Sequence, residues 1–163
     1  MDELPYFLDF EASSLSDVSF PIEVAWSIPS GEIESYLIRP TWDWNDWSPN
    51  AEHLHGLTRE QITKDGLPAW HVAKRMNEVL AGNVVYTDAP EYDGFWLSRL
   101  FEHHNEEPAF ELRHFDSLFP TVSPNRIAFH VWPAKQAAGG QHRAAVDVKY
   151  LQELYRRLKA DTA

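Results

Sequence analysis

An α/β fold is predicted by the order in which two hydrophobic periods follow each other along the chain. The first 39 residues hold short runs rich in Val, Ile, Phe and Tyr, separated by turn residues, which is typical of strands. From residue 58 onward, stretches with a helical period alternate with short apolar runs. Strands followed by alternating helices and strands indicate a mixed sheet covered by helices. No repeat or linker interrupts this order, so we expect one domain over residues 1–163.

Three strands are expected at 5–11, 19–28 and 33–39, where Ser-Asp and Pro-Ser-Gly segments provide the turns between them. Their short connections predict an antiparallel meander. The next segment, 40–50, has no clear period and is expected to be a loop. Its tryptophans could stack on nucleobases, pack against the body of the protein or form a dimer contact, and we favour the last two interpretations together. They are Trp42, Trp44 and Trp47.

Capping residues and prolines bound the remaining elements. Thr58 and Gln61 fit a capping box at the start of a short helix. Pro68 starts a second helix, which ends at Gly82. The other expected elements are a strand at 84–86, a helix that contains Asp93, a strand near 110–115, a partly helical stretch at 124–138 broken at Pro133, and a helix over 144–159.

Four acidic residues stand where the local pattern asks for apolar ones. Asp9 and Glu11 lie on one face of the first strand, because side chains alternate along a strand. Asp93 and Asp147 each lead the apolar stripe of a core-facing helix, although the helix dipole also favours a carboxylate near a helix start. Burying an isolated carboxylate is costly, so such groups are normally paired or bound to a metal. If the four converge, they predict a divalent cation site.

His142 stands close to the last of these acids. It precedes Asp147 by five residues, which on an ideal helix would turn the two side chains about 140° apart. Gly139 and Gly140 just before it indicate a flexible loop. We therefore expect His142 on that loop or at the start of the last helix, where it can swing toward bound metal ions.

Taken in order, these residues resemble the motifs of the DEDDh 3'–5' exonucleases, a family that includes the proofreading subunit of bacterial DNA polymerase III, oligoribonuclease and ribonuclease T. The matching segments are Asp9-x-Glu11, Tyr92-Asp93, His142-x-x-x-x-Asp147 and, between the first two, His55-Gly-Leu-Thr58. The resemblance covers roughly residues 5–158. It implies an RNase H-like fold, which is a mixed five-stranded sheet with helices on both faces.

The resemblance further implies a site for two metal ions, either Mg²⁺ or Mn²⁺. Asp9 would bridge both ions, and Glu11 and Asp147 would complete the shell of the first. Asp93 would act mainly through water on the second ion. His142 would be the general base that takes a proton from the attacking water. The lack of cysteine agrees with a site made of hard oxygen ligands.

The activity implied is a 3'–5' exonuclease that releases nucleoside 5'-monophosphates from the 3' ends of single-stranded DNA or RNA. An oligoribonuclease-like enzyme for very short RNA is one alternative. A noncatalytic domain that keeps the fold to bind nucleic acid or a polymerase is another, although binding alone would not need all five of these residues. No residue in the sequence decides between DNA and RNA.

Substrate contacts are expected from the segment after the first motif and from the histidine segment. Ala12 and Ser13 match the part of the family that contacts the 3' hydroxyl, and Leu15 stands where an apolar wedge often stacks on the terminal base. Leu15 and His55 could instead pack in the core or make a loop hydrogen bond. Asp88 departs from the family, which commonly has Asn shortly before the second-motif Asp. We favour a helix N-cap for Asp88 over a further metal contact.

Net charge is −11, which disfavours tight binding to long duplex DNA. Residues 126–163 hold seven Lys and Arg against three acids, a net of +4 that leaves −15 for the rest of the chain. Phosphates could approach along this segment, or its basic residues could simply form a solvated helix face. The acidic N-terminus and the lack of an apolar run of roughly 18 residues predict a cytoplasmic protein without a membrane contact. A homodimer or a polymerase partner is open.

Overall fold

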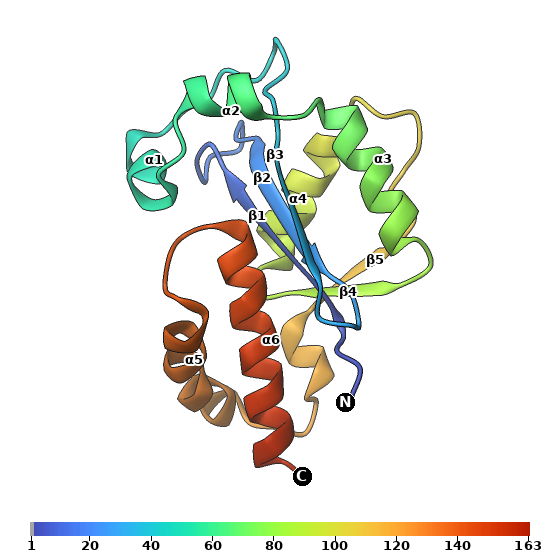
Figure 1. The fold of residues 1–163 in the computed structure, drawn as a ribbon, viewed down its shortest axis with the longest axis vertical. Coiled ribbons are helices and arrows are strands. Elements are labelled where there is room, and N and C mark those ends of the chain that lie inside the picture. Colours follow the sequence, from blue (N-terminus) through green and yellow to red (C-terminus); the bar gives the residue numbers. More distant parts are fainter. Residues whose placement is uncertain (1) are drawn as a thin grey trace.

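A computed structural model describes residues 2–163 and contains one mixed sheet with strand order β3-β2-β1-β4-β5 (Figure 1). The strands are β1 (Tyr6–Ala12), β2 (Pro21–Ser27), β3 (Ile33–Leu37), β4 (Val84–Thr87) and β5 (Glu111–His114). The first three form an antiparallel meander, whereas β4 pairs with β1 and β5 with β4 in parallel. The predicted meander is therefore confirmed.

Helices cover both faces of this sheet, as predicted (Figure 1). They are α1 (Pro49–His55), α2 (Arg59–Asp65), α3 (Ala69–Leu80), α4 (Pro90–Phe101), α5 (Pro124–Ala138) and α6 (Ala144–Asp161). A short 3-10 segment spans Phe115–Leu118. α6 packs on one face of the sheet with α5 beside it, and α4 packs on the other face with α3 beside it. No helix within residues 2–163 is long and apolar enough to cross a membrane.

Strand alternation in β1 divides the buried residues into two cores. Phe7 packs with residues of α6, whereas Leu8 and Phe10 pack with residues of α3 and α4. Because Asp9 and Glu11 follow Phe7 at intervals of two, they lie on the α6 face of the sheet. The core of the fold thus decides which helix meets the acidic residues of β1.

The helix α1 lies partly in the segment that the sequence predicts as a loop. Ser48 caps it, since the Ser48 hydroxyl accepts a hydrogen bond of 3.3 Å from the backbone N–H of Ala51. Pro49 occupies the first turn, and Gly56 ends the helix with a left-handed φ of 72°. A helix of seven residues is too short to show a hydrophobic period, although its capping signals are present.

The predicted break at Pro133 is wrong, because α5 runs continuously from Pro124 to Ala138. Proline removes one helical N–H, so the carbonyl of Phe129 lacks its usual partner. The side chain of Phe129 is 76% exposed, which places this turn of the helix at the protein surface. Water can therefore satisfy the freed carbonyl without ending the helix.

The three tryptophans of the 40–50 segment have different environments. Trp44 is fully buried and stacks on Phe20 with ring centroids 5.3 Å apart. Trp47 is half-buried, and its indole N–H donates a 3.1 Å hydrogen bond to Glu52. Trp42 is 90% exposed. Packing against the body of the protein is thus confirmed for Trp44 and does not describe Trp42.

Candidate metal centre

The structure brings Asp9, Glu11 and Asp147 together at the contact between β1 and α6. One carboxylate oxygen from each of the three lies within 4.8 Å of the others. Asp9 is 9% exposed, and its Oδ2 atom has no hydrogen-bond partner among the described residues. Burial and then the neighbouring Asp147 carboxyl group raise the pKa of Glu11. These three side chains can ligate one cation from two elements that are distant in sequence.

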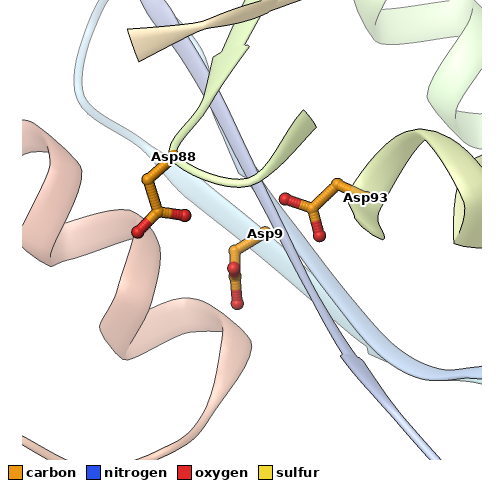
Figure 2. A group of neighbouring side chains, drawn as sticks. All are labelled: Asp9, Asp88 and Asp93. Carbon is orange, nitrogen blue, oxygen red and sulfur yellow. The ribbon is translucent and has the colours of Figure 1, made fainter. Parts of the chain in front are cut away.

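A second acidic cluster shares Asp9 and adds Asp88 and Asp93 (Figure 2). One oxygen from each of these carboxylates again lies within 4.8 Å of the others. Asp93 reaches the cluster from the first turn of α4, and Asp88 reaches it from the loop that follows β4. Asp9 therefore belongs to both clusters.

The position of Asp88 corrects its interpretation as a helix N-cap. The N-cap residue of α4 is Ala89, and no side chain caps this helix. Strand pairing explains where Asp88 lies instead: β1 and β4 run in parallel with Phe7 beside Tyr86. Continuing this register by two residues places Asp88 beside Asp9, on the same face of the sheet. Proline at the start of α4 suggested that Asp88 caps this helix, but the pairing of β1 with β4 determines where Asp88 lies.

Asp93 is held in place by groups of the protein. The hydroxyl of Thr87 donates a hydrogen bond to Oδ2 of Asp93, and the backbone of Phe10 in β1 lies close enough to lower the pKa of this carboxyl group. The same Thr87 hydroxyl accepts a 3.2 Å bond from the N–H of Ala89. The end of β4 and the first turn of α4 are thereby fixed against the middle of β1.

The carboxyl groups of the centre strongly oppose ionisation while no cation is bound. Burial, followed by the negative charges of its neighbours, raises the pKa of Asp9 well above its ordinary value. Burial also raises the pKa of Glu11 to about 9 and that of Asp93 to about 8. The pKa of Asp147 is raised as well, again mainly by burial. Divalent cations would relieve this repulsion, because each brings two positive charges into the cluster.

His142 lies on the loop between α5 and α6, where the sequence places it. It is exposed, and it lines a small pocket of about 160 Å³ together with Asp9, Asp88 and Asp147. Its charge, when present, acts on the Asp147 carboxylate. Lys135 of α5 lines the same pocket and is the one Lys or Arg among its lining residues within 2–163. The pocket therefore contains a titratable base and a cation beside the acidic clusters.

A buried ion pair that the sequence interpretation missed fixes the loop carrying His142. Glu23 of β2 is 4% exposed, and its carboxylate accepts hydrogen bonds from the Arg143 guanidinium at 2.6 to 3.1 Å. The backbone N–H of Ala144 donates to the same carboxylate at 2.9 Å. A charged residue in the middle of an otherwise apolar strand was the available signal. Glu23 anchors the start of α6 to the sheet, next to both His142 and Asp147.

The segment after Glu11 is tied down by its own hydrogen bonds. The N–H of Ser13 donates to Phe20, its carbonyl accepts from Ser48, and its hydroxyl donates to Asp46 at 2.8 Å. Its backbone follows Ala12, where the register between β1 and β2 shifts. Leu15, two residues on, is 71% exposed. Ser13 is thus committed to protein contacts, whereas the Leu15 side chain is open to solvent.

His55 is buried at 6% exposure, at the end of α1. Its Nδ1 atom accepts a 3.0 Å hydrogen bond from the N–H of Leu57, and the ring faces the backbone of Ala12. Burial lowers its pKa, so the neutral ring is favoured. These contacts hold the turn after α1 against the end of β1. A contact between His55 and substrate stays a prediction.

Several solved structures share this fold over nearly the whole chain, although no protein-family model and no curated protein matches the sequence. The fold they share with this chain is that of exonuclease I structures, and the predicted mixed five-stranded sheet with helices on both faces is confirmed. The zinc ion bound form of an E. coli exonuclease I complex with single-stranded DNA aligns with a TM-score of 0.71 at 14% identity, over 96% of this chain and 40% of that one.

Two further structures agree. A product-bound exonuclease I aligns with a TM-score of 0.70 at 16% identity, over 95% of this chain and 43% of that one. A moderately thermophilic exonuclease I from Methylocaldum szegediense gives 0.67 at 17% identity, over 95% and 40%. The chain thus spans about two fifths of the length of these proteins. At such low identities the likeness shows the fold.

The residues present fit divalent cations. Every donor in the two clusters is a carboxylate oxygen, the ligand type that Mg²⁺ and Mn²⁺ prefer. A buried carboxylate oxygen without a partner is rare, because leaving such a group unsatisfied is costly. Oδ2 of Asp9 is one, and Asp9 lies between the two clusters. A cation bound there would satisfy this atom.

Proposed function

We propose that this chain is a metal-dependent 3'–5' exonuclease that hydrolyses phosphodiester bonds at the 3' ends of single-stranded DNA or RNA and releases nucleoside 5'-monophosphates. The observation that carries the proposal is the buried Asp9 carboxylate, which joins two acidic clusters on the fold of the exonuclease I nuclease domain. A domain that only binds nucleic acid has no need to bury carboxylates together, since negative charge repels phosphate.

The acidic residues divide into two sets for two ions, either Mg²⁺ or Mn²⁺. Asp9 belongs to both, Glu11 and Asp147 to the first, and Asp93 to the second. When bound, the ions would neutralise charge on the scissile phosphate and on the leaving 3' oxygen and would activate the attacking water. Thr87 keeps Asp93 oriented toward this site through its hydrogen bond.

His142 is the proposed general base. It lines the pocket that Asp9 and Asp147 also line, and a neutral imidazole can accept a proton from the attacking water near neutral pH. The Glu23–Arg143 ion pair limits the movement of its loop at the side of α6. Gly139 and Gly140, both with a positive φ, leave the other side free to adjust when substrate binds.

The substrate contacts proposed are those of the segment that follows β1. Leu15, which is largely exposed, would stack on the terminal base, and the backbone around Ala12 and Ser13 would meet the 3' hydroxyl. Lys135 would attract a phosphate to the pocket. Solved exonuclease I structures contain a dT13 or dA16 oligonucleotide, which supports a single strand as the substrate class.

Two experiments test the proposal. Asp9→Ala and Asp147→Ala variants should lose turnover of a labelled oligonucleotide while their circular dichroism spectra match the wild type. The product of the wild-type reaction, resolved by chromatography, should be nucleoside 5'-monophosphate. Near-normal rates in either variant would show that the catalytic site lies elsewhere. A series of RNA and DNA lengths would separate this enzyme from one limited to very short RNA.

Metal-independent binding of a single strand, without turnover by the folded wild type, would favour a noncatalytic domain. Sedimentation of the same samples would show whether the chain forms a homodimer. A polymerase partner would be sought only if the protein binds a single strand without cleaving it. The 163 residues form one domain in this proposal. A single cooperative unfolding transition would support it.

A further inference from the structure

We propose that Asp88 is a fifth carboxylate ligand of the metal centre and that, with Asp9 and Asp93, it forms a second cation site that fills before nucleic acid binds. The proposal rests on the proposed function, because it concerns the same centre. It gives the second ion a direct protein ligand in addition to Asp93. The DEDDh exonucleases that the sequence resembles commonly have Asn near this position.

The first support is geometric. One oxygen each of Asp9, Asp88 and Asp93 lies within 4.8 Å of the other two, and Figure 2 shows the three carboxylates directed toward a common space. Cations of this class have ligand oxygens at about 2.0–2.6 Å, so one ion can contact oxygens that lie up to about 5 Å apart. The three side chains therefore need little movement to bind one ion.

The second support is independent of the cluster. Asp9 is 9% exposed, and its Oδ2 has no hydrogen-bond partner among residues 2–163. Asp9 belongs both to the cluster with Glu11 and Asp147 and to the cluster with Asp88 and Asp93. A cation bound by Asp9, Asp88 and Asp93 would give this buried oxygen a partner.

The third support is the difference between Asp88 and Asp93. The Thr87 hydroxyl donates a hydrogen bond to Asp93, so this carboxylate is already partly satisfied by a protein group. Asp88 stands in the short loop between β4 and α4 and is exposed. Asp88 is therefore free to turn to an ion, whereas Asp93 is held.

Manganese binding without nucleic acid tests this assignment. Free Mn²⁺ is measured by electron paramagnetic resonance during titration of the metal-free protein. The wild type should bind two ions. Asp88→Asn should keep the first ion at wild-type affinity and bind the second at least tenfold more weakly. Glu91→Gln is the matched control, since it removes an exposed acid from the nearby first turn of α4. It should leave both affinities unchanged.

The rise in melting temperature on adding Mn²⁺ is a second measurement, and it should be smaller for Asp88→Asn than for the wild type or Glu91→Gln. Equal affinities for two ions in Asp88→Asn and the wild type would overturn the assignment of Asp88, as would a wild type that binds one ion. The proposed function would survive either result if metal-dependent cleavage persisted and Asp9→Asn abolished it. A wild type that bound no Mn²⁺ and cleaved nothing would overturn both.

Discussion

The guanidinium of Arg143, at the start of α6, lies 2.6 Å from the buried carboxylate of Glu23 in β2. This pair links the sheet to the loop that carries His142 and to the helix that carries Asp147. Arg143 is partly exposed, with 40% of its side-chain surface open, whereas only 5% of Glu23 is. The pair therefore fixes the position of two proposed catalytic groups without being one of them.

Replacing Arg143 with Met should destabilise the protein and slow catalysis. Glu23 would keep its burial but lose the positive partner, at a cost of about 1–3 kcal/mol once the exposure of Arg143 is considered. Urea unfolding measures the cost, and kcat should fall while KM changes less. The double variant Arg143→Met, Glu23→Gln should recover part of the stability. An unchanged kcat in the single variant would show that the pair does not position His142.

His142→Ala should lower kcat by about 10²–10⁴-fold, the range typical of a lost general base. Mn²⁺ affinity should stay at the wild-type value, because the proposed role of His142 is that of a base and not of a metal ligand. His53→Ala is the matched control, since His53 is exposed on α1. A loss of Mn²⁺ binding in His142→Ala would instead identify this residue as a ligand.

The metal-free protein should become less stable as pH rises from about 5 to about 9. In the unfolded chain carboxyl groups lose their protons near pH 4, whereas the folded pKa of Glu11 is about 9 and that of Asp93 about 8. Between these values the folded state holds protons that the unfolded state has lost, so the free energy of unfolding decreases with pH. The stabilisation that comes from these retained protons is fully present below about pH 4 and is lost as pH rises through the folded pKa values.

Urea titrations in EDTA at several pH values measure this slope, which can reach about 1.4 kcal/mol per pH unit for each extra proton. Glu11→Gln should make the slope shallower, because it removes one of these protons. A free energy of unfolding that rises with pH in EDTA would show that the pKa values of these carboxyl groups are not raised in the folded state.

Trp44→Ala should cost about 3–5 kcal/mol of stability, because Trp44 is fully buried against Phe20. Trp42→Ala should change stability by at most about 0.5 kcal/mol, since Trp42 is 90% exposed. Chemical denaturation of the two variants measures this contrast within one loop. A comparable loss in Trp42→Ala would indicate that its exposed ring is covered in solution.

Periodicity in the sequence was sufficient to predict the orientation of the acidic residues that lie on regular strands and helices. Alternation placed Asp9 and Glu11 on one strand face, and the helical stripe turned Asp93 and Asp147 inward, which is where the structure has them. The interaction of α6 with β1 then brings these elements together. Hydrophobic patterning predicts faces well because burial of apolar side chains determines which face points inward.

Long-range pairing could not be predicted in the same way. Asp88 lies beside Asp9 because of the parallel register of β1 and β4, which is not visible in a local pattern. Glu23 and Arg143 are 120 residues apart, so nothing in the sequence near either residue indicates the other. Local capping signals compete with such contacts, and at Asp88 the strand pairing determined the outcome.

A time course on 5'-labelled single-stranded DNA and RNA, with Mg²⁺, with Mn²⁺ and with EDTA, tests the central claim most directly. The wild type should shorten the labelled strand stepwise from its 3' end only when metal is present, and Asp9→Asn should leave the strand intact. Cleavage that persisted in EDTA, or no cleavage of either strand by the folded protein with metal, would contradict a metal-dependent 3'–5' exonuclease.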